Sequence, residues 1–181
     1  GALPILCIGE KGILTADLVF PAGEGNLLDI SGGVASNSVP DTAWARLKDV
    51  SAEAVRYLQQ ERPEVEILME GDEVTIRAYG KAAHAFVPHE GENAIYRLLA
   101  LLSDYGLVTG QTARRLHTLR ECFCDDYGVG LRIDKEDALS GKTTCVGGMI
   151  RMEEGMIRQN INVRYAVEQN KEELFCKLQE R

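Results

Sequence analysis

Residues 74–85 have the sequence VTIRAYGKAAHA, and the organisation of the whole 181-residue chain can be worked out from this stretch. Apolar and polar residues alternate over 74–79, which predicts a half-buried strand. Gly80 ends the alternation, and small alanines leave His84 uncrowded just before an apolar helix expected from Glu92. A histidine between a strand end and a helix is well placed to meet a ligand. The alternative is a solvent-exposed turn histidine.

Two hairpins supply much of the expected sheet. The first joins 65–69 to 73–79, and the second joins 143–152 to 156–165. Further strands and helices are expected elsewhere in the chain: strands over 13–20, 27–30 and around 43–47, and helices after an N-cap at Ser51, over 92–105, over 111–124 and from about Lys171.

Helices placed between antiparallel strand pairs favour an α+β fold, with an antiparallel sheet and helices on one face. The length accommodates two ferredoxin-like halves of the split β-α-β type within one unit, residues 1–181. The sequence contains no exact internal repeat, so a duplication would be structural only.

Composition excludes several classes of partner. The formal net charge of -8 argues against a nucleic-acid surface, which needs clustered Lys and Arg, and no apolar run approaches the roughly 20 residues that cross a bilayer. The five cysteines are odd in number, and no signal peptide is recognisable, which favours thiols in a reducing cytoplasm. The five are Cys7, Cys122, Cys124, Cys145 and Cys176.

No pattern for a self-contained reaction centre is present. The three histidines are His84, His89 and His117, and none has a second histidine at helical spacing or a His-x-Asp partner. The sequence also lacks a Gly-x-Ser-x-Gly elbow and a phosphate-binding glycine loop. We therefore expect no metal ligands in this chain.

Three polar residues at strand ends or tight turns are the candidates for binding: Asn37, His84 and Arg164. Arg164 follows the alternation of 159–165 and shares one strand face with Asn160 and Asn162. Its planar fork of donors suits a carboxylate, and the alternative is a surface arginine of an exposed sheet. All three candidates are expected to be exposed, with no buried partner.

Six motifs in a fixed order give the chain a resemblance to a known family. They are Glu10-Lys11-Gly12-Ile13, Ile30-Ser31-Gly32-Gly33, Ser36-Asn37-Ser38-Val39-Pro40-Asp41, Gly80-Lys81-Ala82-Ala83-His84-Ala85, Gly91-Glu92-Asn93-Ala94 and Asn162-Val163-Arg164-Tyr165. Together they resemble the zinc aminoacylase and carnosinase-type metallopeptidases, in the order of the bacterial dipeptidase-V, or Xaa-His dipeptidase, branch. The match runs over nearly the whole chain.

The resemblance implies one part of a larger enzyme. Members of that family carry two zinc ions in a catalytic domain and have a second, inserted lid or dimerisation domain, and this chain resembles the lid alone. The resemblance therefore implies that 1–181 is a lid fragment, inactive by itself, whose partners are its own catalytic domain and a dipeptide or short peptide. The abrupt chain ends agree with this expectation, because the zinc-binding motifs would lie outside them.

The resemblance also implies a role for each candidate. His84 matches the lid histidine that stabilises the tetrahedral oxyanion, Arg164 the arginine that takes the terminal carboxylate, and Asn37 the asparagine that bonds the substrate backbone. Two departures concern specificity: Phe86 replaces a small hydroxyl residue, and Ala166 replaces a common proline that would stiffen the strand end.

A second hypothesis comes from a different class of protein. The chain would then be a stand-alone α+β module that binds small carboxylates or a partner and has no catalysis.

Overall fold

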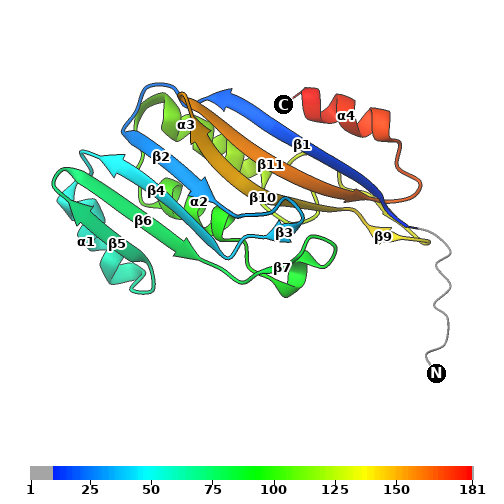
Figure 1. Ribbon diagram of the computed structural model, residues 1–181, viewed down its shortest axis with the longest axis horizontal. Helices are drawn as coiled ribbons and strands as arrows, with labels where there is room; N and C mark the ends of the chain where they lie inside the picture. The colour runs from blue at the N-terminus through cyan, green and yellow to red at the C-terminus, as the bar shows by residue number, and fades with distance from the viewer. Residues whose placement is uncertain (1–9, 181) are drawn as a thin grey trace.

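Seven antiparallel strands form one sheet in the computed structural model, which describes residues 10–180 (Figure 1). The strand order across the sheet is β1-β11-β10-β2-β4-β6-β5. The strands of this sheet are β1 (Gly12–Pro21), β2 (Leu27–Gly32), β4 (Thr42–Lys48), β5 (Glu66–Glu70), β6 (Glu73–Tyr79), β10 (Thr144–Glu153) and β11 (Met156–Tyr165). Every strand expected from the sequence is present. Of the five cysteines, Cys7 lies outside the described residues.

Two short strand pairs and the helices complete the structure. The short pairs are β3 (Ser38–Val39) with β7 (Ala83–His84), and β8 (Glu136–Asp137) with β9 (Gly141–Lys142). The helices are α1 (Ala52–Glu61), α2 (Ala94–Asp104), α3 (Gly110–Cys122), α4 (Lys171–Gln179) and the one-turn 3-10 helix η1 (Pro88–Glu90). The expected helices are confirmed, and none in the described part of the chain is long and apolar enough to cross a membrane.

The two faces of the sheet differ in character because side chains alternate along each strand. On β11, Ile157, Ile161 and Val163 are buried in one core with the apolar residues of α2 and α3. These two helices lie behind the sheet in Figure 1. Alternation places Asn162 and Arg164 on the opposite face, which we call the open face. The open face is thus the one that carries the polar residues of β11.

The α+β class is confirmed, and both expected split β-α-β halves are recognisable. Strands β4 and β5 both pair antiparallel with β6, so β4-α1-β5 is a split β-α-β unit with β6 in the middle. The other half has the same arrangement. Strands β1 and β10 both pair antiparallel with β11, and α2 and α3 precede β10 in the chain, so β1, these helices and β10 form a second split β-α-β unit with β11 in the middle. The first unit is inserted between β1 and α2.

Asn93 fixes α2 to the sheet. Its side-chain Oδ1 accepts hydrogen bonds from the N–H groups of Ile95 (2.9 Å) and Tyr96 (3.3 Å), which caps the helix N-terminus. Its Nδ2 donates to the carbonyl oxygen of Gly147 on β10 at 3.1 Å, and the residue is buried. One amide therefore joins the most apolar helix to the centre of the sheet.

Asn93→Ala should destabilise the domain by about 2–3 kcal/mol, because it removes a helix cap and leaves the Gly147 carbonyl without this donor. The matched control is Ser51→Ala, which removes the exposed cap of α1 and should cost only about 1 kcal/mol. Urea denaturation of both variants measures the difference. Equal losses would show that the bond to β10 contributes nothing.

Candidate functional site

The β3–β7 pair brings Asn37 and His84 together from distant parts of the sequence. Ser38 is the register partner of His84, and the N–H of Ala85 donates to the carbonyl oxygen of Asn37 at 3.0 Å. Both Asn37 and His84 are exposed. Beneath them Val39, Ala85 and Val146 form a small buried cluster that seats the pair on the open face of β10.

A backbone junction at the start of α2 holds this pair in place. Lys81 and Glu92 exchange two hydrogen bonds, both 2.9 Å, and the N–H of Gly80 donates to the carbonyl oxygen of Asp41 at 2.8 Å. A Cβ atom on Gly80 would lie 2.0 Å from the Glu92 carbonyl oxygen. Only glycine permits this approach, so the residue that ends β6 also sets the path to His84.

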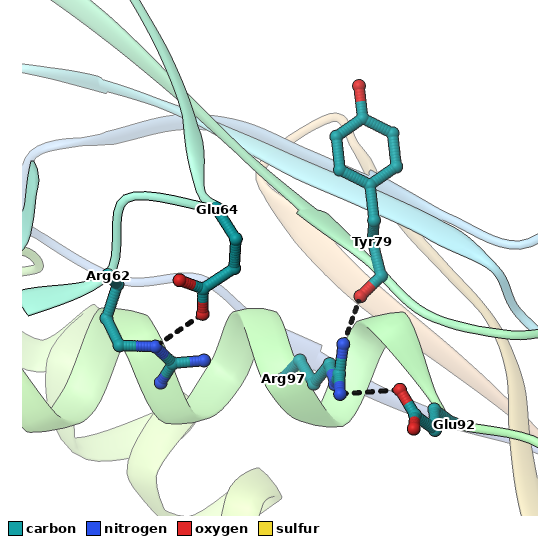
Figure 2. A network of polar contacts seen from close by, with 5 residues as sticks. All are labelled: Arg62, Glu64, Tyr79, Glu92 and Arg97. Atoms are coloured by element: carbon teal, nitrogen blue, oxygen red, sulfur yellow. Dashed lines mark hydrogen bonds and ion pairs between the residues drawn. The ribbon is translucent and has the colours of Figure 1, made fainter.

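Side chains reinforce the same junction, as Figure 2 shows. Arg97 of α2 donates from Nη1 to the carbonyl oxygen of Tyr79 at 2.9 Å and pairs through Nη2 with Glu92 at 2.5 Å. A separate ion pair of 2.6 Å joins Arg62 to Glu64 just beyond α1. Arg97 therefore ties the last residue of β6 to the first turn of α2.

The hydrogen bonds of His84 define its tautomer. The N–H of Phe86 donates to Nδ1 of His84 at 3.1 Å, so Nδ1 acts as an acceptor and the neutral ring carries its proton on Nε2. No acceptor within residues 10–180 bonds to Nε2, which leaves one N–H donor on an exposed ring. That arrangement suits a group that donates to a developing anion.

Phe86 contacts the beginning of β1. The Lys11 ammonium lies 5.4 Å from the centre of the half-exposed Phe86 ring and also donates to the Lys142 carbonyl oxygen. Partial burial lowers the pKa of Lys11, against the opposing effect of Asp137. The sequence identified Phe86 as unusual, and the cation over its ring was missed because Lys11 is distant in sequence.

Arg164 reaches the same end of the sheet through its neighbour on β10. Thr144 is its register partner, and the Thr144 hydroxyl donates to the carbonyl oxygen of Ala85, the residue after His84, at 2.9 Å. The expectation of full exposure is wrong for Arg164, which is half-buried and donates from Nε to the buried Asn162 at 2.9 Å. The structure therefore brings all three candidates to one region.

The chain just after Arg164 is held by two polar groups. The N–H of Ala166 donates to the Thr143 hydroxyl at 3.2 Å, a bond that proline could not make, so Ala166 does not leave this strand end loose. Asp137 accepts from the N–H groups of Ser140 (2.5 Å), Leu139 (3.0 Å) and Glu168 (3.1 Å). These bonds, led by that of Ser140, lower the pKa of Asp137 from 3.8 to about 2.

A metal site does not fit the residues of this region. Within residues 10–180 no group of three or more His, Cys, Asp or Glu side chains could hold a metal ion. The candidate site instead offers an imidazole N–H, a side-chain amide and a guanidinium, all of which are hydrogen-bond donors. It can bind carbonyl, oxyanion and carboxylate oxygens.

Comparison with known proteins relates the chain to dipeptidases. It is 30% identical over 171 residues to "Putative dipeptidase YtjP" of Bacillus subtilis (strain 168), and 30% identical over 173 residues to "Putative dipeptidase SH1171" of Staphylococcus haemolyticus (strain JCSC1435). Each match covers 87% of this chain, but the chain spans only 37% and 36% of the length of these relatives. The expected resemblance to part of a dipeptidase is confirmed.

Two other comparisons add little. No protein-family model matches the chain. Among solved structures, aminoacylhistidine dipeptidase from Vibrio alginolyticus matches with a TM-score of 0.29 and 13% identity, over 95% of this chain and 43% of that chain.

Asp137 should make the stability of the domain pH-dependent in the acid range. Its folded pKa is lowered, so its contribution is present above pH 3.8 and is lost as the pH falls toward about 2. Denaturation of the wild type and of Asp137→Asn between pH 7 and pH 2 tests this. The difference in stability should shrink below pH 4, and a constant difference would contradict the assignment.

Proposed function

We propose that this chain, residues 1–181, is the lid domain of a zinc-dependent dipeptidase and supplies substrate-binding and oxyanion-stabilising groups to a catalytic domain elsewhere in the same protein. The observation that supports this most is the gathering of Asn37, His84 and Arg164 at one end of the sheet. Among the described residues, no acceptor bonds to the Asn37 amide, to Nε2 of His84 or to the terminal nitrogens of Arg164. The dipeptidase relatives, which are nearly three times as long as their match to this chain, agree with a domain of a larger protein.

His84 is proposed as the catalytic residue of the lid. Attack on a peptide carbonyl places negative charge on the carbonyl oxygen, and the Nε2 proton would donate to that oxygen. A donor already oriented toward a developing oxyanion contributes roughly 3 kcal/mol to the transition state. The bond from the Phe86 N–H to Nδ1 keeps the proton on Nε2 and so keeps the donor available.

Arg164 and Asn37 are proposed to bind the substrate. The guanidinium offers its terminal nitrogens to the carboxylate at the end of a dipeptide, which selects short peptides with a free carboxyl end. The exposed amide of Asn37, which precedes the strand that pairs with that of His84, would bond the substrate backbone between the two. The three groups thus recognise both the reacting carbonyl and the chain end.

The two zinc ions of the proposed enzyme belong to the rest of the protein. The described residues of this chain cannot hold them, so the chain alone should not hydrolyse peptides. When bound, the zinc pair would supply the activated water. We place the parent enzyme in the cytoplasm and expect no nucleic-acid or membrane partner.

His84→Ala in the protein that contains this chain should lower kcat about a hundredfold and change KM little, because an oxyanion donor acts mainly in the transition state. The matched control is His89→Ala, which removes an exposed histidine of the adjacent η1 and should leave kcat unchanged. Steady-state kinetics on a dipeptide measures both. Equal loss in the two variants, or unfolding by His84→Ala, would contradict the role.

Arg164→Ala should raise KM for dipeptides with a free carboxylate at least tenfold and leave their amides unaffected, since the lost contact is a charge-assisted fork. The matched control is Arg158→Ala on the same face of β11, where the arginine pairs instead with Asp17 at 2.8 Å. If free and amidated substrates lose equally, Arg164 does not bind the carboxylate.

The alternative function is a stand-alone α+β module that binds small carboxylates or a partner without catalysis. Such a module would have no kcat for His84→Ala to lower, yet would lose carboxylate affinity in Arg164→Ala. The kinetic experiments therefore separate the two functions.

A further inference from the structure

A buried amide stands behind Arg164 on the open face. Asn162 is only 3% exposed, and its Oδ1 accepts the hydrogen bond from Arg164 Nε at 2.9 Å. Its Nδ2 donates to the hydroxyl oxygen of Thr15, its register partner on β1, at 3.2 Å. The three side chains form one line of hydrogen bonds from β1 to the guanidinium.

Chemistry fixes the direction of this line. A guanidinium can only donate, so the atom of Asn162 that faces Arg164 is the carbonyl oxygen, and the NH₂ group must face Thr15. With Nε engaged, the guanidinium keeps its two terminal nitrogens for another acceptor, and no described residue takes them. A carboxylate can then accept two parallel hydrogen bonds only end-on, across both terminal nitrogens.

We propose that Asn162 is a positioning residue, which with Thr15 holds the Arg164 guanidinium end-on toward the substrate carboxylate. This role rests on the function proposed above for Arg164. It extends that function by assigning the orientation of the fork, and so the specificity for the carboxylate, to two residues that do not touch the substrate.

A nearby asparagine, Asn160, makes a similar contact between β11 and β1 but does not bond to Arg164. Asn160, two residues earlier on the same face, donates from Nδ2 to Oδ1 of Asp17 on β1 at 2.7 Å. That contact ties β11 to β1 in the same manner and does not reach Arg164. Asn160 is therefore a matched control, because Asn160→Ala removes a cross-strand amide of similar burial without releasing the guanidinium.

The orientation can be tested in the 181-residue chain without any enzymatic activity. Nitrogen-edited NMR detects arginine Nε–H protons, and the Arg164 signal can be assigned by its loss in Arg164→Lys. Asn162→Ala should speed the exchange of this proton with water roughly tenfold, whereas Asn160→Ala should not. Thr15→Val, which keeps the shape of the side chain, should give a smaller change in the same direction.

Kinetics of the longer protein test the consequence. Asn162→Ala should raise KM for free dipeptides about tenfold, spare their amides and leave kcat nearly unchanged, while Asn160→Ala changes neither. Unaltered Nε–H exchange in both Asn162→Ala and Thr15→Val would overturn the positioning role. If exchange responds as expected but free and amidated substrates lose alike, the positioning role stands for the arginine and the proposed carboxylate function fails.

Discussion

The candidate site depends on one close approach between backbones, where Gly80 lies against the Glu92 carbonyl oxygen. This approach lets Lys81 and Glu92 exchange their two hydrogen bonds, which join the end of β6 to the start of α2. Asn93 caps α2 and also bonds to β10. The position of the loop that carries His84 is therefore fixed relative to the centre of the sheet. The two-residue strands β3 and β7, which are too short to be stable alone, are thereby held at a defined place.

Hydrogen-bond donors are distributed unequally over the domain. The helix-covered face of the sheet is packed with apolar side chains, whereas the open face carries a line of amide and guanidinium groups along β11. In a chain with a net charge of -8, the donors of exposed Asn37 and His84 and of half-buried Arg164 form a local exception that favours anionic ligands. Substrate binding is therefore proposed for the polar open face because of its local donors, and not because of the overall charge of the chain.

Sequence predicted the long elements well and the short contacts poorly. The strands β10 and β11 extend over ten residues each, and the Ser51 cap precedes a clear helix, so periodicity and capping were sufficient. Strands β3 and β7 have two residues each, too few to show alternation, and their pairing joins segments far apart in the chain. The two split β-α-β halves were predicted, but the insertion of one half between β1 and α2 of the other was not, because strand order depends on such distant pairings.

The same limit applies to the site. The sequence placed Asn162 and Arg164 on one strand face, but the bond between them and the burial of Arg164 depend on side-chain direction and on Thr15 from β1. Likewise, the proton position on His84 follows from the turn that brings the Phe86 N–H to Nδ1, which no spacing encodes. Candidate residues could be identified from sequence, whereas their hydrogen-bonded states required the structure.

We propose that this chain covers a peptide bond that is hydrolysed by the rest of the protein. The most direct measurement is a structure of the longer protein with a dipeptide analogue whose scissile group is a tetrahedral phosphinate. We expect His84 Nε2 within about 3 Å of a phosphinate oxygen and the terminal nitrogens of Arg164 on the analogue's carboxylate. A bound analogue with both side chains turned to solvent would contradict it.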